Sequence, residues 1–398
     1  MNRPIRVLSL YEGFFAGGAR ILHSDLVAGL HAGGDQQHRV LSIASEARRE
    51  STLQPMQNDP RYIRLDRAGV EVVTLGRTAG GDPPERSTFT DFELRIAADA
   101  VAGADIILSL KEQPLGLLLA LRDHGLMPDI PVAACLHRSD PTHSGPALGW
   151  LTEAAATGLL TAMISCAEST DEAYNRFAPH SPQRFIIANG IDTEHFRPGA
   201  ATEVEATREQ LAVPPTAGVV VFAARFDAMK NPGLFLRAVA AHSARHPGTH
   251  YVLCGAGMTW GNSALQDLID DAGIPGGTAL HLLGIRDDMP AIYRIADIVA
   301  LTSAFGEASP LCLMEGAACG ATPVTTDVGD SARVVRGIGA VTGQDPDEIA
   351  AVWAAVLSKR GDLRDAALSA RGRHGRERMI EDSRAVVTSL LQRERAAA

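Results

Sequence analysis

The stretch from Asp297 to Asp327 reads DIVALTSAFGEASPLCLMEGAACGATPVTTD, and its pattern indicates how the chain folds. It begins with the apolar run Asp297–Thr302 and ends with a second one, Thr322–Asp327. Between these runs, Pro310–Cys319 has the length and the apolar spacing of a short helix. A strand, a helix and a second strand in this order predict a β–α–β unit with buried, parallel strands.

Short apolar runs and helix-length segments alternate in the same way along the rest of the chain. Further strands are expected at Ile5–Tyr11, Arg39–Ala44, Val70–Leu75, Asp105–Leu110, Pro131–His137, Ala162–Cys166, Arg184–Ala188, Gly218–Ala224, His250–Gly255 and Ala279–Leu283. Further helices are expected at Gly18–Ala32, Asp91–Ala102, Leu115–His124, Gly149–Leu160, Glu203–Leu211, Pro232–Arg245, Asn262–Ala272, Asp288–Ile295 and Pro346–Leu357. The alternation predicts an α/β protein built from doubly wound parallel sheets.

The length of the chain, 398 residues, fits two domains of this kind. The turn-rich stretch Asn189–Pro198 is the expected linker. We therefore expect an N-terminal domain over 1–190 and a C-terminal domain over 191–371, two Rossmann-like sheets that face each other across a cleft. The helical segment 372–398 has no strand to follow, and we expect it to cross back onto the N-terminal domain.

Composition excludes several classes of protein. The net charge is −10 with no basic stripe, which argues against a nucleic-acid partner. No apolar stretch approaches the roughly 18–20 residues of a membrane span, and the N-terminus lacks the pattern of a secretory signal, so we expect a cytoplasmic protein without stable membrane insertion. The five cysteines stand singly, which is typical of reduced core thiols. Nearly all basic residues are arginines, with lysine only at positions 111, 230 and 359.

Two acids follow the strand Asp297–Thr302. Glu307 lies in the loop at the carboxyl end of that strand, where open α/β sheets bind their ligands. Glu315 shares a helix face with Leu311 and Ala318, and an unpaired carboxylate among apolar neighbours would be costly unless ligand hydroxyls satisfied it. The alternative is that Glu315 bonds to backbone groups and Glu307 is a solvated loop acid.

The ends of this helix carry their own signals. Ser309 is the expected N-cap, Pro310 is expected at the first helical position, and Gly320 is expected just past the end.

Two cations, Arg225 and Lys230, follow the strand Gly218–Ala224 at the start of a helix. Helix N-termini already favour anions, and an arginine fork with a mobile lysine suits a diphosphate. The alternative is a pair of surface cations.

Two weaker signals lie in the first half of the chain. Gly17 and Gly18 follow the first strand, where a tight turn needs glycine in any case. His137 ends the strand Pro131–His137, and an isolated histidine in such a place is more often structural than catalytic.

Glu307 and Glu315 resemble the E-x7-E signature of the retaining GT-B glycosyltransferases of family GT4, within a block E-x-x-P-x-x-L-x-E-x-x-A-C-G. The resemblance implies that Glu307 contacts hydroxyls of the donor sugar and that Glu315 binds the nucleotide ribose. The segment with Arg225 and Lys230 is similar to the family's G-R-x-x-x-x-K, which holds the donor diphosphate, although Ala224 replaces the usual glycine.

The resemblance implies further roles. It places Gly18 near the diphosphate and His137 near the donor sugar and the acceptor. The turn Gly284-Ile285-Arg286 looks like the family's base-binding turn, ahead of a Y-x-x-A-D motif at Tyr293 and Asp297 that we interpret as structural. The remaining donor contacts are expected from Gly17, Ala308, Ser309, Pro310 and Leu311; many family members carry Gly-Phe where this chain has Ala308-Ser309.

The function that follows is retaining hexosyl transfer from a nucleotide sugar, UDP-linked by preference or GDP-linked, to a hydroxyl of a small soluble acceptor in natural-product or glycoconjugate biosynthesis. We expect the catalytic residues to be His137, Glu307, Arg225 and Lys230, with front-face substitution, no metal and no cofactor. Two rival functions are a nucleotide-sugar 2-epimerase on the same fold and a non-catalytic, transferase-like partner. A homodimer is left open.

Overall fold

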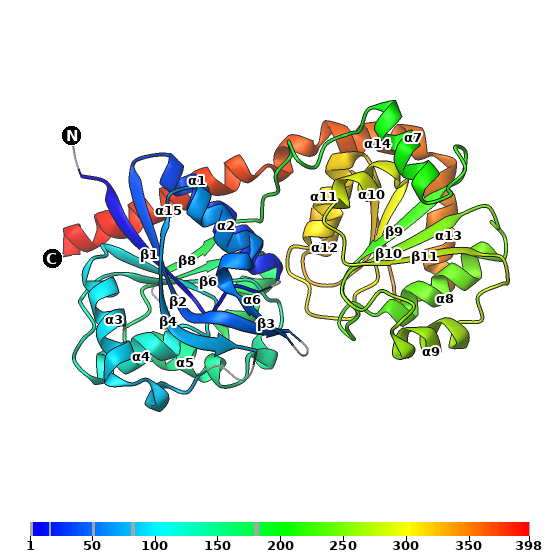
Figure 1. Cartoon of the computed structure of the whole chain (residues 1–398). Helices are drawn as coiled ribbons and strands as arrows, with labels where there is room; N and C mark the ends of the chain where they lie inside the picture. The colour runs from blue at the N-terminus through cyan, green and yellow to red at the C-terminus, as the bar shows by residue number, and fades with distance from the viewer. Residues whose placement is uncertain (1–2, 16, 50–51, 81–83, 179–182, 398) are drawn as a thin grey trace. The chain divides into compact units, whose positions relative to one another are not determined.

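The computed structural model describes residues 3–15, 17–49, 52–80, 84–178 and 183–397. The chain divides into two compact units (Figure 1). Unit 1 contains Met1–Asn189 and Glu377–Ala398, and unit 2 contains Gly190–Arg376.

Unit 1 is built on one eight-stranded sheet, and its strands are β1 (Ile5–Tyr11), β2 (Gln36–Arg49), β3 (Thr52–Pro55), β4 (Glu71–Ala79), β5 (Ile106–Leu110), β6 (Val132–Leu136), β7 (Ala162–Ser165) and β8 (Gln183–Ile186). Their order is β3-β2-β1-β5-β6-β7-β8, with β4 also beside β2. The pairs are parallel except for the antiparallel pair of β2 and β3. The strand order therefore reverses direction between β1 and β5.

Helices cover both faces of this sheet (Figure 1). One face packs against α3 (Asp91–Ala102), α4 (Leu115–Asp123), α5 (Pro146–Ala156) and α6 (Glu168–Asn175). The other packs against α1 (Gly18–Ala32), α2 (Pro60–Arg67) and α15 (Arg376–Ala397). Buried strands such as β5 and β6 are apolar along most of their length because neither face meets water.

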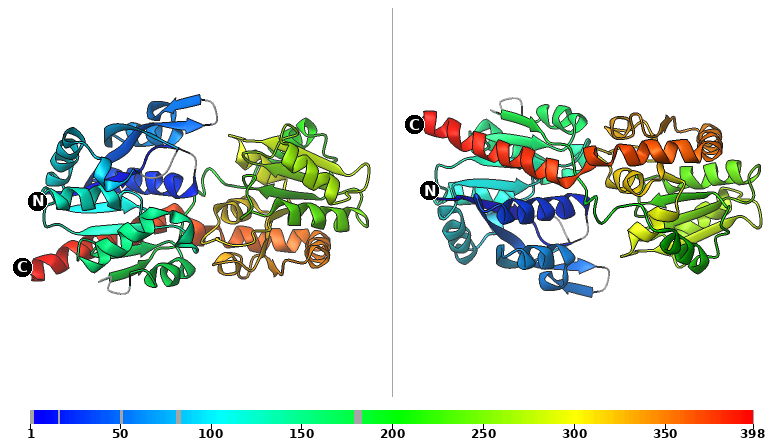
Figure 2. Two further views of the ribbon diagram at one scale, coloured as in Figure 1. Left: turned by 90° about the horizontal axis from the view of Figure 1, so that it is seen from below. Right: turned by 90° about the horizontal axis from the view of Figure 1, so that it is seen from above.

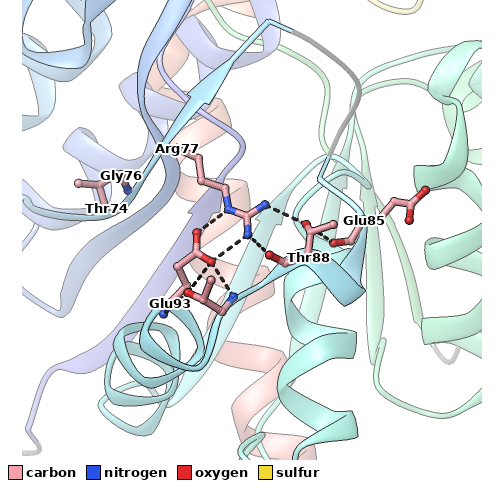
Figure 3. A network of polar contacts seen from close by, with 7 residues as sticks. Thr74, Gly76, Arg77, Glu85, Thr88 and Glu93 are labelled. Atoms are coloured by element: carbon pink, nitrogen blue, oxygen red, sulfur yellow. Dashed lines mark hydrogen bonds and ion pairs between the residues drawn. The ribbon is translucent and has the colours of Figure 1, made fainter.

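A polar network joins the end of β4 to the beginning of α3 (Figure 3). The Arg77 guanidinium donates to Glu93 at 2.5 and 2.8 Å and to the Thr88 carbonyl at 2.6 Å. Glu93 also completes a capping box with Thr90. These hydrogen bonds, and above all the one from Arg77, lower the pKa of the Glu93 carboxyl to about 2. Burial acts to raise this pKa, but its effect is smaller. The network thus fixes the start of α3 through one ionised acid.

Unit 2 contains a six-stranded parallel sheet of β9 (Val219–Ala223), β10 (His250–Cys254), β11 (Ala279–Gly284), β12 (Ile298–Leu301), β13 (Thr322–Thr326) and β14 (Ala340–Thr342). Their order, β11-β10-β9-β12-β13-β14, is that of the Rossmann fold. The switch point at which ligands bind in such sheets lies between β9 and β12.

The helices of unit 2 also form two layers (Figure 1). One face of the sheet packs against α8 (Pro232–Ser243), α9 (Ser263–Asp271) and α13 (Pro346–Ser358). The other packs against α7 (Ala201–Gln210), α10 (Met289–Ile295), α11 (Leu311–Cys319) and α12 (Ser331–Val334), while α14 (Arg360–Ser369) adjoins α11 and β13.

The chain passes between the units twice. On the unit 2 side, Ile191 forms a parallel bridge with Gly375, and the Ile191 amide donates to the His374 carbonyl at 2.8 Å. On the unit 1 side, the Arg378 guanidinium donates to the carbonyls of Ala188 and Asn189 at 2.8 and 3.0 Å. Most of the expected linker Asn189–Pro198 therefore belongs to unit 2, which begins at Gly190.

The C-terminal helix α15 lies along unit 1 (Figure 2). Its Val387 and Leu390 belong to the same buried cluster as Val7 of β1. A Cβ added at Gly29 of α1 would lie 2.4 Å from Ile380, so glycine allows the two helices to approach closely.

The predicted α/β architecture is confirmed, with differences at individual elements. β2 runs from Gln36 to Arg49, well beyond the expected Arg39–Ala44, and α5 begins at Pro146, three residues before the expected Gly149. Helices α2, α6 and α12 and strands β3 and β14 were not expected from the sequence. Within the described ranges, none of the helices is both long enough and apolar enough to cross a membrane.

Candidate active site

Two loops meet at the switch point of unit 2, one after β9 and one after β12. The Ala304 amide donates to the Met229 carbonyl at 2.8 Å. Gly306 has a φ of +76°, and a Cβ there would lie 2.8 Å from the Met229 sulfur. Glycine is needed at 306 both for the left-handed backbone and for this close approach. The loops therefore hold each other in position.

This arrangement brings Lys230 and Glu307 together in an ion pair. The Ser303 hydroxyl donates to the same Glu307 oxygen at 2.5 Å. The side chains of Lys230 and Glu307 are only 16% and 6% exposed, so solvent screens the pair little. One Glu307 oxygen is thus committed to protein partners.

Arg225 lies in the same loop but remains accessible. Its Nε donates to Asp227 Oδ2 at 2.8 Å, while Asp227 Oδ1 accepts from the Met229 amide at 2.8 Å. The Arg225 side chain is 56% exposed. Asp227 therefore orients the guanidinium through one edge and leaves the other edge available to an anion.

Glu315 projects from α11 and has a protein partner that the sequence did not indicate. The Tyr293 hydroxyl donates to Glu315 Oε2 at 3.0 Å. Burial raises the pKa of the Glu315 carboxyl to about 7, although the bond from Tyr293 lowers it. The expectation of an unpaired acid was therefore wrong in part, since one oxygen is bonded and the acid titrates near neutral pH.

The start of α11 also differs from the expectation. The N-cap is Pro310, and the helix begins at Leu311, so neither the N-cap assigned to Ser309 nor the first helical position assigned to Pro310 is correct. The ψ of Pro310, 117°, is extended and ends the loop. No side chain caps this end of α11, so its first amides are available to an anion. Gly320 ends the helix with a φ of +100°, as expected.

The expected base-binding turn follows β11. The Gly284 amide donates to the Met258 carbonyl at 2.9 Å, and its carbonyl accepts from Gly255 at 2.7 Å. Arg286 is engaged by Asp288 at 2.7 and 2.5 Å, whereas Ile285 is 71% exposed. The turn therefore presents its backbone and Ile285 to a ligand, with the Arg286 guanidinium already paired.

In unit 1, Gly17 and Gly18 lie at the N-terminus of α1, which no side chain caps. Arg20 of this helix bonds to Glu12 at 2.6 Å and to the Gly13 carbonyl at 3.0 Å. The loop after β1 is thereby fixed to the first turn of α1, and the free amides of this turn point to an anion-binding role.

His137 follows β6 directly, and neither of its ring nitrogens has a hydrogen-bond partner among the described residues. It lines a cavity of about 30 Å³ together with His23 and Ser165, large enough for one water. Burial lowers the pKa of His137 to about 3, so the imidazole is neutral at physiological pH. Such a group offers hydrogen bonds and cannot hold a proton for catalysis at pH 7.

The structure thus gathers Arg225, Lys230, Glu307 and Glu315 at the carboxyl edge of one sheet, together with the turn around Gly284. The residues Ala308, Ser309, Pro310 and Leu311 form the adjacent loop and helix start. Gly17, Gly18 and His137 belong to the other unit.

Two supporting residues, Ser303 and Asp227, were not singled out in the sequence, and Tyr293, interpreted there as structural, donates to Glu315 of the site. The Y-x-x-A-D motif was the sequence signal that could have pointed to Tyr293. Its partner in the motif, Asp297, is structural, because its carboxylate accepts from the Val219 amide at 2.9 Å.

Residues 203–374, which lie within unit 2, match the family model described as Glycosyl transferases group 1. Unit 2 belongs to this family. The resemblance drawn from the E-x7-E block is therefore confirmed. The D-inositol 3-phosphate glycosyltransferase of Corynebacterium jeikeium is 33% identical over 184 residues, which are 44% of this chain and 42% of that protein. The corresponding protein of Salinispora arenicola is 34% identical over 188 residues, 44% and 41% of the two chains. The match thus spans about two fifths of each relative.

Similarity to solved structures extends over both units. HepE of Anabaena, in a complex with UDP and glucose, has a TM-score of 0.76 at 18% identity, over 97% of this chain and 100% of that chain. At this identity the similarity shows the fold alone, and it confirms the GT-B fold of two Rossmann-like units.

Proposed function

We propose that this chain is a retaining glycosyltransferase that moves a sugar from a nucleotide sugar to a hydroxyl of a small soluble acceptor in the cytoplasm. The observation that supports it best is the set at the switch point of unit 2. A lysine–glutamate ion pair, an arginine with one accessible edge and the half-buried Glu315 with its raised pKa surround the crevice of a Rossmann sheet.

Each part of a nucleotide sugar has a complementary group there. The diphosphate would bind Arg225, Lys230 and the free amides of α11. The ribose hydroxyls would donate to Glu315, and the base would meet the turn at Gly284. The second oxygen of Glu307 is left for hydroxyls of the sugar. We favour UDP over GDP because the similar HepE structure was solved with UDP-glucose, at a TM-score of 0.76 and 17% identity over 97% of this chain and 100% of that chain.

The chemistry that follows is electrostatic. The bond between the anomeric carbon and the phosphate oxygen breaks as the acceptor oxygen bonds to the same face of that carbon. The acceptor proton passes to the departing phosphate. Lys230 and Arg225 are already held in place, so they stabilise the growing negative charge without reorganising. Glu307 is held by Lys230 and Ser303, which suits a sugar-positioning acid better than a covalent nucleophile.

Unit 1 would supply Gly17, Gly18 and His137. Neutral His137 would hydrogen-bond to the sugar or to the acceptor hydroxyl.

The test measures the release of UDP from UDP-glucose by the full chain, with and without a panel of small hydroxyl acceptors, and the anomeric configuration of the product by NMR. We expect acceptor-dependent UDP release and an α-linked product. A β-linked product would contradict retention. Release of UDP with a free 2-epimerised sugar would support the epimerase instead, and no UDP-glucose turnover under any condition would support the non-catalytic partner.

A further inference from the structure

Unit 1 has a switch point of its own, between β1 and β5, and it is lined by charged side chains. The loop that begins at Glu12 follows β1, and Lys111 is the first residue after β5. Arg138 is the second residue after β6. The pairing of Leu110 with Cys135 and the bond from the Lys111 amide to the Cys135 carbonyl, 3.0 Å, bring the ends of β5 and β6 side by side. By the rule for open α/β sheets, a ligand of unit 1 binds at this edge.

Lys111 is held there at a conformational cost. Its φ is +68°, in the left-handed region that disfavours residues with a side chain. Such strain persists only where the surrounding structure imposes it, and it concentrates at binding and catalytic sites. Burial, and then the nearby charges of Arg20 and Arg138, lower the pKa of the Lys111 ammonium to about 8.

The charges around Lys111 do not balance. Arg20 is paired with Glu12 at 2.6 Å, and Glu112 accepts from the Ser144 hydroxyl. In the part of the chain that the structure describes, the side chains of Lys111 and Arg138 form neither an ion pair nor a hydrogen bond. The three cations near this edge thus outnumber its two acids, Glu12 and Glu112. The two cations without partners, Lys111 and Arg138, lie within electrostatic range of each other.

Neighbouring polar atoms are also unsatisfied. His137, between the end of β6 and Arg138, has two ring nitrogens without partners, and the buried Gln113 has a free side-chain oxygen. A structural role for Lys111 and Arg138 would pair them with Glu112, whose second oxygen also lacks a partner. The structure instead leaves both cations unpaired, as a site for an external anion does.

We propose that the acceptor carries an acidic group, a phosphate monoester or a carboxylate, and that Lys111 and Arg138 bind it at the switch point of unit 1. The inference rests on the proposed function. Arg138 supplies a planar fork and Lys111 a point charge, which together suit either oxyanion. Neutral His137 then adjoins the acceptor hydroxyl that attacks the sugar.

The experiment uses the full chain saturated with UDP, so that the donor site cannot bind the probes. Inorganic phosphate, glucose 6-phosphate, glucuronate and glucose are titrated by calorimetry into the wild type and into Lys111→Met, Arg138→Met and the exposed control Arg67→Met. We expect the acidic probes to bind and glucose to bind at least about tenfold more weakly. Lys111→Met and Arg138→Met should each weaken the acidic probes about tenfold, with Arg67→Met unchanged. Tighter binding of glucose 6-phosphate than of glucuronate would assign a phosphate, and the reverse a carboxylate.

Equal binding of glucose and the acidic probes, or unchanged binding by both variants, would overturn the proposal. UDP binding by the same variants keeps the two proposals separate. If the wild type binds UDP but not the acidic probes, only the inference about the acceptor is contradicted. If the wild type does not bind UDP, the proposed function itself is contradicted.

A second readout separates a binding role from a structural one. Lys111→Gly removes both the strained conformation and the unpaired charge, so a binding role predicts a higher melting temperature together with lost acid binding. A lower melting temperature would instead show that Lys111 stabilises the fold, and would overturn the assignment.

Discussion

At the residue scale, Glu315 has the most distinctive chemistry in unit 2. Its pKa of about 7 reflects burial, with only Tyr293 to hold the ionised form. Ribose hydroxyls are donors, so they bond best to the ionised carboxylate. Donor binding should therefore release a proton near neutral pH.

We predict that UDP-glucose binds more tightly as pH rises from 6 to 8. The donor itself does not titrate in this range, whereas free UDP does. Calorimetry in buffers of different ionisation enthalpy should show a proton released on binding, and Glu315→Gln should bind weakly with no dependence on pH. An unchanged pH profile in Glu315→Gln would show that another group is responsible.

A second residue-scale prediction concerns the charge at the leaving group. Lys230→Met should lower the rate constant for UDP release by about 10²-fold or more, because a preorganised cation at the developing charge is lost. Arg225→Ala should lower this rate constant to a similar extent. Fixed-time assays of UDP release measure the rate constants of both variants, with Lys359→Met as the control. Activity within twofold of the wild type in both variants would remove these cations from the phosphate site.

At the scale of elements, the interlocked loops after β9 and β12 place Lys230 beside Glu307. Gly306→Ala introduces a Cβ near the Met229 sulfur and a side chain at φ +76°. We expect unit 2 to lose about 1–3 kcal/mol of stability and the chain to bind UDP-glucose more weakly. Thermal unfolding and calorimetry measure the two effects.

The matched control is Gly361→Ala in α14, where an added Cβ would meet no atom within 4 Å. Adding Met229→Ala to Gly306→Ala should restore part of the affinity, because it relieves the steric part of the effect. If Gly306→Ala binds and unfolds like Gly361→Ala, the interlock does not position the site.

The elements also show what the sequence can specify. The apolar runs of β5 and β6 were recognisable because parallel strands are buried on both faces. The start of α11 was misplaced by one residue because serine before proline is a common cap signal, whereas the chain here extends through Pro310. The long β2 was underestimated because its second half, with Glu46, Arg48 and Arg49, is polar.

For the site, the motifs located the residues but not their partners. The bond between Tyr293 and Glu315 joins two helices, and no local pattern shows which residues a fold brings together. The left-handed conformation of Lys111 likewise has no signature in the sequence, because lysine is not a residue that turns select.

At the scale of the whole molecule, the two units should respond differently to acid. Unit 1 buries His23, His38 and His137, and burial lowers their pKa values to about 4, 3 and 3. Below about pH 6.5 the unfolded imidazoles bind protons that the folded ones cannot, so each group costs up to about 1.4 kcal/mol of stability per pH unit. Unit 2 also contains histidines with lowered pKa values, to about 4 for the buried His242. There, however, the raised pKa of Glu315 acts in the opposite sense and offsets part of this cost, since the folded acid keeps its proton between about 4.5 and 7.

We therefore predict that acidification from pH 7.5 to 5.5 lowers the melting temperature of unit 1 more than that of unit 2. Differential scanning calorimetry can resolve the two transitions, and domain-specific assignment follows from the stabilisation of unit 2 by UDP. His38→Gln should reduce the acid sensitivity of unit 1. Equal shifts of both transitions would contradict this account.

The mechanism also predicts independence from metal ions, since its electrostatic stabilisation comes from Arg225, Lys230 and helix amides. Activity should be unchanged after EDTA treatment and dialysis, as measured by UDP release. Loss of activity that Mg²⁺ or Mn²⁺ restores would require a metal in the site.

The central claim is that the switch point of unit 2 holds the nucleotide sugar, and a crystal structure of the full chain with UDP-glucose tests it most directly. We predict the diphosphate within hydrogen-bond distance of Arg225 and Lys230, the ribose hydroxyls on Glu315 and the base against the turn at Gly284. A nucleotide bound elsewhere, or Glu315 without contact to the ribose, would contradict it.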